Sequence, residues 1–236
     1  MPCLGPWECT FPRVKRLLAP LLFALAAFFF PDSMAVRPLW LLVTALHEAC
    51  HGLVATLLGG TITSFHVNMN AGGWCGYSMP DSLWRTLLVA SAGYTGSLVV
   101  GGLLLVAAAR TRHDRWFLGA LGLVLLYLSW LCLTSASLFG TLFCASTGVV
   151  FLVLARLRLG AVHDFLLRTI GLSCALMATR DIKDDLVDRT VQGSDADAIA
   201  RLLHVPTYPV GVAWLVVATL LVGFFLWWAI KVDSGE

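Results

Sequence analysis

The stretch LLVTALHEACHGLVATLLGG, residues 41–60, decides what kind of protein this is. Pro38 precedes it and a pair of glycines closes it, and these residue types are typical of helix starts and helix ends. The helix between them has about 21 residues and a length of roughly 32 Å, which matches the hydrocarbon core of a bilayer. Yet His47, Glu48 and His51 lie near its middle. We therefore predict a membrane helix that carries a functional site.

The composition of the whole chain agrees with a membrane protein. Of the 236 residues, 58% are hydrophobic and 13% are charged, and the mean hydropathy is +0.83. Soluble domains usually carry about 25% charged residues, so the composition predicts a polytopic protein whose main partner is the lipid bilayer. The net charge of +2, with no basic tract among aromatic residues, excludes nucleic acid as a partner. The seven cysteines form no CxxC pair and are expected to be buried.

The apolar segments predict an all-α polytopic fold with five to seven transmembrane or re-entrant helices. Five segments are long enough to span a bilayer, namely 39–59, 85–109, 116–134, 137–155 and 208–230. Two more, 17–30 and 165–178, have about 14 residues each and are expected to be tilted, re-entrant or half-helices. We expect a polar N-terminal segment (1–16), one integral-membrane domain (17–231) and a C-terminal tail (232–236).

Two polar stretches interrupt the membrane pattern. Residues 60–83 are rich in β-branched, aromatic and glycine residues, which predicts either a small β-hairpin at 61–79, turning at Gly72-Gly73, or a connecting loop. Residues 179–207 hold a dense group of charges, and there Ser194 and Asp197 fit an S-x-x-D capping box before a short helix.

Basic clusters give partial information on orientation. The clusters at 110–115 and 156–158 lie on one side if 116–134 and 137–155 form a hairpin. The positive-inside rule would make that side cytoplasmic. The cluster at 13–16 joins them only if the first apolar segment does not cross the membrane, so the sequence leaves the orientation open.

The motif HEACH fits H-E-x-x-H and predicts a metal site. Residues four apart lie on one helix face, so His47 and His51 can offer two imidazole nitrogens to one ion. Glu48 is turned about 100° away and can act as a base on a zinc-activated water. The alternative is that these are ordinary polar residues in a helix bundle. A charged side chain at mid-bilayer costs about 2.5–3.5 kcal/mol, and a divalent cation is the simplest compensating partner.

A catalytic zinc site needs a third protein ligand. The remaining histidines are isolated and are expected at the surface or interface: His66, His113, His163 and His204. The stretch RDIKDDLVD places four carboxylates on one helix face, namely Asp181, Asp184, Asp185 and Asp188. They are either a source of the third ligand or a solvated acidic face paired with nearby basic residues. The short apolar segment before them favours the ligand.

Four segments together resemble one family. HEACHGLVATLLGG, AGGWCGY, SAGYTGS and DIKDDLVDRTVQGSDADA resemble the M50B-like membrane metallopeptidases, which are similar to site-2 proteases, over about residues 38–200. The resemblance implies that His47 and His51 bind Zn2+ and that Glu48 is the catalytic base. It also implies an aspartate as third ligand, which maps most plausibly to Asp181, with Asp185 and then Asp184 as alternates.

This sequence departs from the family pattern in two places. The glycine usual before the second histidine is Cys50, and DIKDD stands where typical site-2 proteases carry N-P-x-x-x-D-G. The triplet Ser194-Asp195-Ala196 resembles a recurring family motif, but the capping box already explains Ser194, so we assign the triplet no role. Gly93 and Gly96 of SAGYTGS are expected to allow close helix packing and are also given no chemistry.

The resemblance implies that the protein is a zinc-dependent intramembrane metalloprotease. Such an enzyme hydrolyses peptide bonds of membrane-associated, transmembrane substrates through a zinc-activated water. The strand edge expected within 61–79 would pair with an unwound substrate. The competing hypothesis is a catalytically silent protein of the same fold that binds or escorts membrane segments. A transporter fits poorly, because polar residues concentrate at 47–51 and 179–197 instead of spreading over several helices.

Overall fold

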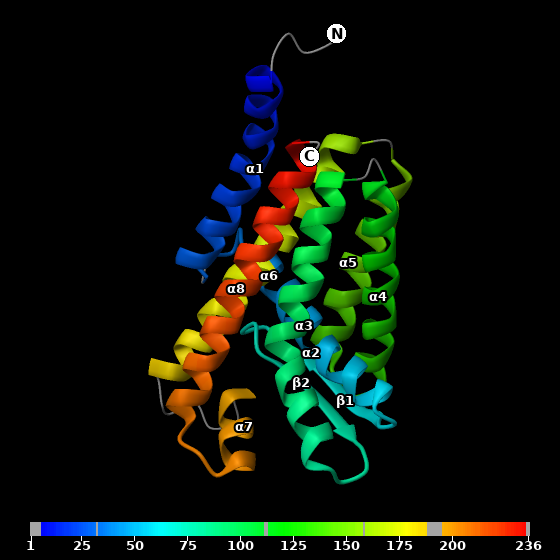
Figure 1. The fold of residues 1–236 in the computed structure, drawn as a ribbon. Helices are drawn as coiled ribbons and strands as arrows, with labels where there is room; N and C mark the ends of the chain where they lie inside the picture. The colour runs from blue at the N-terminus through cyan, green and yellow to red at the C-terminus, as the bar shows by residue number, and fades with distance from the viewer. Residues whose placement is uncertain (1–5, 32, 111–112, 158, 188–194, 235–236) are drawn as a thin grey trace.

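The fold is a bundle of helices with one small sheet (Figure 1). The computed structural model describes residues 6–31, 33–110, 113–157, 159–187 and 195–234, and of residues 6–15, 183–187 and 232–234 only the backbone. The elements in these ranges are α1 (Pro6–Phe29), α2 (Arg37–Leu57), β1 (Thr61–Val67), β2 (Gly73–Ser78), α3 (Leu83–Arg110), α4 (Asp114–Thr134), α5 (Leu138–Arg156), α6 (Gly160–Val187), α7 (Asp195–Leu203) and α8 (Thr207–Ser234).

Six of these helices are long and apolar enough to cross a membrane: α2, α3, α4, α5, α6 and α8. The apolar part of α1, Arg16–Phe29, is shorter. The chain is therefore a multi-pass integral membrane protein, and the predicted all-α polytopic class is confirmed. Each of the five long apolar segments predicted from the sequence has become one helix.

Helix α6 differs from its prediction. The sequence suggested a short apolar segment at 165–178, but Gly160–Ile182 is long enough to span. The reason is local charge compensation, because the buried Arg168 donates from Nε to Asp164 Oδ1 at 2.7 Å and from its terminal nitrogen to the Ala108 carbonyl at 3.3 Å. The predicted segment begins only after Asp164, whereas in the folded bundle the pairing of Asp164 with Arg168 lets the helix begin at Gly160.

The predicted β-hairpin is confirmed. β1 and β2 pair antiparallel, with Phe65 opposite Cys75 and Val67 opposite Gly73. The turn comes earlier than the predicted Gly72-Gly73: Asn68 N–H donates to the Gly72 carbonyl, Ala71 has a φ of 63°, and Gly73 already belongs to β2. The β1 side is covered, because Phe65 N–H donates to Ser135 Oγ at the α4–α5 connection. Within the described part of the chain, β2 has no second strand partner.

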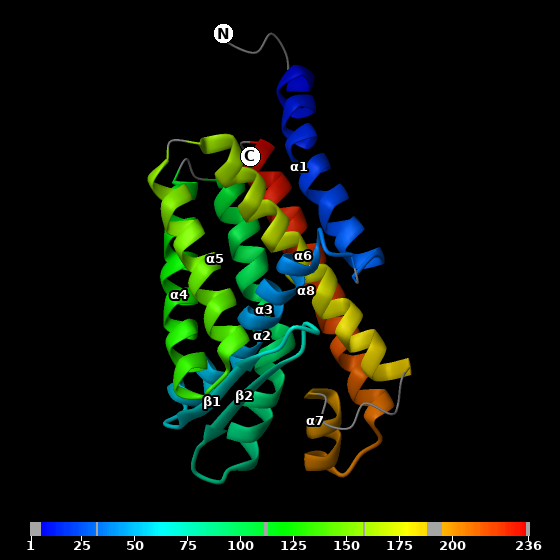
Figure 2. The same ribbon diagram turned by 180° about the vertical axis from the view of Figure 1, so that it is seen from behind.

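Of the six exposed cations among the described side chains, five lie at one end of the bundle (Figures 1 and 2). The start of α1 projects beyond the ends of α3, α5 and α8, whereas α7 and the hairpin lie at the opposite end of the bundle. We call the former the basic end, after its exposed cations Arg16, Arg110, Arg115, Arg156 and Lys231. Helix α1 stops part of the way along the bundle, where α2 begins, so its N-terminus stays at the basic end. The positive-inside rule then predicts that this end is cytoplasmic.

Candidate metal centre

Helix α2 carries the H-E-x-x-H residues into the interior of the bundle. His51 is buried, and its Nδ1 lies 2.7 Å from the Val89 carbonyl of α3. A carbonyl only accepts, so this bond requires Nδ1–H and leaves Nε2 of a neutral ring with its lone pair. That lone pair faces His47, whose Nε2 lies 3.3 Å away. The α3 backbone therefore orients one of the two imidazoles as a metal ligand requires.

A third donor comes from the first residue of α7. Asp195 Oδ2 lies 3.3 Å from His47 Nε2, and its Oδ1 lies 3.2 Å from His51 Nε2. The donor atoms of these three residues all lie within 4.8 Å of one another. Segments far apart in the sequence thus bring two imidazole nitrogens and one carboxylate close enough together to bind one ion.

The electrostatic environment of Asp195 favours the ionised form of its carboxylate. Burial disfavours the charge on Asp195, but hydrogen bonds from the two adjacent imidazoles, when these are protonated and hold no ion, outweigh that cost and keep the pKa of its carboxyl at about 2. Asp195 Oδ2 is nevertheless buried without a well-aligned hydrogen bond among the described residues. A buried anionic oxygen with such a deficit is suited to a cation.

Gly93 of α3 lies next to the donor atoms of His47, His51 and Asp195, and its lack of a side chain leaves a space between them. A Cβ at this position would collide with His47 Nε2, His51 Nε2 and Asp195 Oδ2. Any larger residue would therefore fill the place of an ion. The open space and the donor set of two nitrogens and one oxygen both fit zinc, which takes three protein ligands in catalytic sites. The packing role that the sequence suggested for Gly93 is incomplete, because the glycine also clears the centre.

We expect Gly93→Ala to lower zinc affinity at least about tenfold, because its methyl group would displace donor atoms from one another. The measurement is bound zinc in the purified protein over a range of free zinc concentrations. Gly96→Ala is the matched control, since a Cβ there would press on Cys50 Cβ at 2.6 Å and not on the donors. Equal zinc affinity in Gly93→Ala and the wild type would show that the ion does not lie in this space.

Glu48 lies beside the donors in a cavity of about 190 Å³. β2 covers this residue: the Cys75 backbone is hydrogen-bonded to the Glu48 carboxylate, and a Cβ on Gly73 would lie 2.6 Å from Glu48 Cγ. The hairpin turn is also tied to α2, because Thr44 Oγ1 donates to the Ala71 carbonyl at 2.9 Å. Glu48 is thus held between its own helix and the first residues of β2.

The predicted third ligands lie elsewhere or outside the described side chains. Asp181 lines the Glu48 cavity from α6 but does not belong to the group of three donors. The side chains of Asp184 and Asp185 are outside the described residues. Among the described residues, the group of three donors includes none of the isolated histidines His66, His113, His163 and His204. The structure therefore brings Asp195, and not Asp181, to the two imidazoles.

The sequence contains a signal for Asp195 that differs from the acidic run around Asp181. The triplet Ser194-Asp195-Ala196 resembles a family motif, and helix capping explains only its serine. In the structure Asp195 begins α7, and its carboxylate points back to α2. Ser194 itself lies outside the described residues.

Taken together, the fold and the site define a polytopic membrane protein with a candidate metal centre of two histidines and one aspartate. Residues 20–228 match the family model described as Peptidase M50B-like. The chain belongs to this family, which confirms the resemblance seen in the sequence. No curated protein and no solved structure matches the chain.

Proposed function

We propose that this protein is a zinc-dependent intramembrane metalloprotease that cleaves peptide bonds of transmembrane substrates. His47, His51 and Asp195 are the proposed zinc ligands, and Glu48 is the proposed general base. The observation that carries the proposal is the convergence of three donors on the gap left by Gly93, next to the cavity that holds Glu48. Membership of a membrane peptidase family supports the coarser part of the proposal.

The arrangement suits amide hydrolysis. Zinc bound by these ligands supplies Lewis-acid polarisation of the scissile carbonyl and of the attacking water. Glu48 accepts the proton of that water and later delivers it to the leaving amine. The hydrogen bond from the Cys75 backbone and the close approach of Gly73 keep its carboxylate in place between these two transfers.

The hairpin supports a substrate in extended form. An amide within a helix is shielded by its own hydrogen bonds, so a membrane-spanning substrate has to unwind locally before it is cut. An unwound segment regains backbone hydrogen bonds by pairing with a strand edge. β2 has the available edge and begins at Gly73, directly against Glu48. Pairing along β2 would therefore carry the substrate backbone past the base.

The first test is metal dependence in mild detergent. We expect about one zinc per chain by elemental mass spectrometry, since one three-ligand site is proposed. The probe for cleavage is a labelled peptide with one apolar span interrupted by glycine and proline. A chelator should abolish cleavage, and added zinc should restore it. Folded protein that binds no zinc would instead favour the silent relative that binds membrane segments without cutting them.

A further inference from the structure

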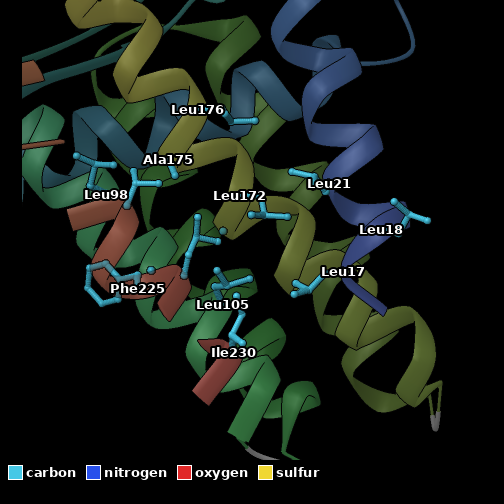
Figure 3. Close-up of a pocket in the computed structure, with 14 residues that line it drawn as sticks. Leu17, Leu18, Leu21, Leu98, Leu105, Leu172, Ala175, Leu176, Phe225 and Ile230 are labelled. Atoms are coloured by element: carbon cyan, nitrogen blue, oxygen red, sulfur yellow. The ribbon is translucent and has the colours of Figure 1, made fainter. Parts of the chain in front are cut away.

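A second cavity, of about 530 Å³, lies between α1, α3, α6 and α8 (Figure 3). It is lined by 14 residues, all apolar and mostly leucine, and we call it the leucine cavity. On α3 it extends from Leu98 to Leu105, which places it nearer the basic end than Gly93 and the metal centre. Its volume falls within the range of about 300–1,000 Å³ typical of small-molecule sites.

The leucine cavity opens toward the surrounding lipid. Leu18 of α1 is 54% exposed and Ile230 of α8 is 52% exposed, whereas Leu105 at the inner wall is 3% exposed. Figure 3 shows side chains of α1 facing those of α6 and α8 across this space. Because α1 packs chiefly on α6 and only slightly on α8, the opening lies between α1 and α8. Its occupant in a membrane is therefore apolar.

The dimensions of the cavity suit a hydrocarbon chain. Along α8 the lining runs from Val222 to Ile230, which corresponds to roughly 12 Å of helix. The cavity provides about 530 Å³ and its lining is wholly apolar, so a single hydrocarbon chain fits without separating the four helices.

The basic residues near the leucine cavity indicate that the lipid has an anionic head group. Arg16 directly precedes Leu17 of the lining, Lys231 directly follows Ile230, and both cations are exposed. Arg110 ends α3 one turn or so beyond Leu105. Three of the four helices that line the cavity thus have a basic residue just beyond the lining residues, in each case toward the basic end. Juxtamembrane Lys and Arg attract anionic lipid, by about 1 kcal/mol each.

We propose that the leucine cavity binds one acyl chain of an anionic phospholipid, with the lipid phosphate against Arg16 and Lys231. The chain fills the space between α1 and α8, and the phosphate joins one cation from each of these two helices. The bound lipid therefore holds α1 onto the bundle. This inference is independent of the proposed protease activity.

The experiment is native mass spectrometry of the full chain in mild detergent, with phosphatidylglycerol and phosphatidylcholine of identical acyl chains. We expect one retained phosphatidylglycerol and at least about tenfold weaker binding of phosphatidylcholine. Arg16→Gln combined with Lys231→Gln should reduce this preference to below about threefold. Ala175→Phe, which fills the cavity from α6, should remove the bound lipid of either kind.

Two controls match these variants. Arg115→Gln combined with Arg156→Gln removes the same charge from the basic end away from the cavity, and Ala213→Phe adds the same ring at an exposed position of α8. Both should bind phosphatidylglycerol as the wild type does. An equal loss of preference in the arginine control would overturn the proposal in favour of diffuse surface charge. If Ala175→Phe blocks peptide cleavage but leaves lipid binding unchanged, the cavity receives substrate and the lipid assignment is wrong.

Discussion

Glu48→Gln is expected to lower kcat for peptide cleavage by about 10²–10⁴-fold, the usual contribution of a general acid–base residue. Glutamine has the same size and can still accept the hydrogen bond from the Cys75 backbone, so the covering by β2 is retained. It cannot accept a proton from water at neutral pH. KM and zinc content should therefore change little.

The measurement combines steady-state cleavage of the labelled span peptide with zinc content and the unfolding midpoint of the same preparation. Asp181→Asn is a useful companion, because it removes another carboxylate from the cavity that holds Glu48. Cleavage by Glu48→Gln at the wild-type rate would contradict the proposed role of Glu48 as general base. Loss of zinc in Glu48→Gln would assign this residue to holding the ion instead of moving a proton.

The membrane helices and the two histidines were predictable because both signals are local. Apolar length is a property of each segment by itself, and the spacing of His47 and His51 sets one helix face without reference to the rest of the fold. The hairpin was predictable for the same reason, from the residue types of 61–79. Only its turn differs from the predicted Gly72-Gly73, because Ala71 is the residue that adopts a left-handed conformation there.

The differences between the sequence-based expectations and the structure come from long-range contacts. Helix α6 begins before the predicted segment, because Asp164 pairs with Arg168 and a carbonyl of α3 accepts a hydrogen bond from the same guanidinium group, a contact that joins residues 60 positions apart. Asp195 is far from His47 in the chain, and its approach depends on how α7 packs beside α3. In a sequence, an acidic run such as that around Asp181 therefore indicates a metal ligand more strongly than a single aspartate at a helix start does.

Asp195→Asn is expected to weaken zinc binding by more than about 100-fold, since even residues that only support the ligands contribute 10–100-fold. An amide of the same shape keeps the packing of α7 but removes the negative charge that the two imidazoles stabilise. Asp181→Asn should leave zinc affinity within about threefold of the wild type, because this carboxylate lies in the cavity and not among the three donors.

The comparison separates the assignment that the sequence favours from the one that the folded chain favours. Zinc titrations of both variants, with His47→Ala as the reference for a destroyed site, give three affinities on one scale. If Asp195→Asn matches His47→Ala, the third ligand is Asp195 and the short helix α7 is part of the metal centre. If Asp181→Asn loses zinc while Asp195→Asn keeps it, α6 supplies the ligand. Asp195 would then serve only to join α7 to α2 through its contacts with His47 and His51.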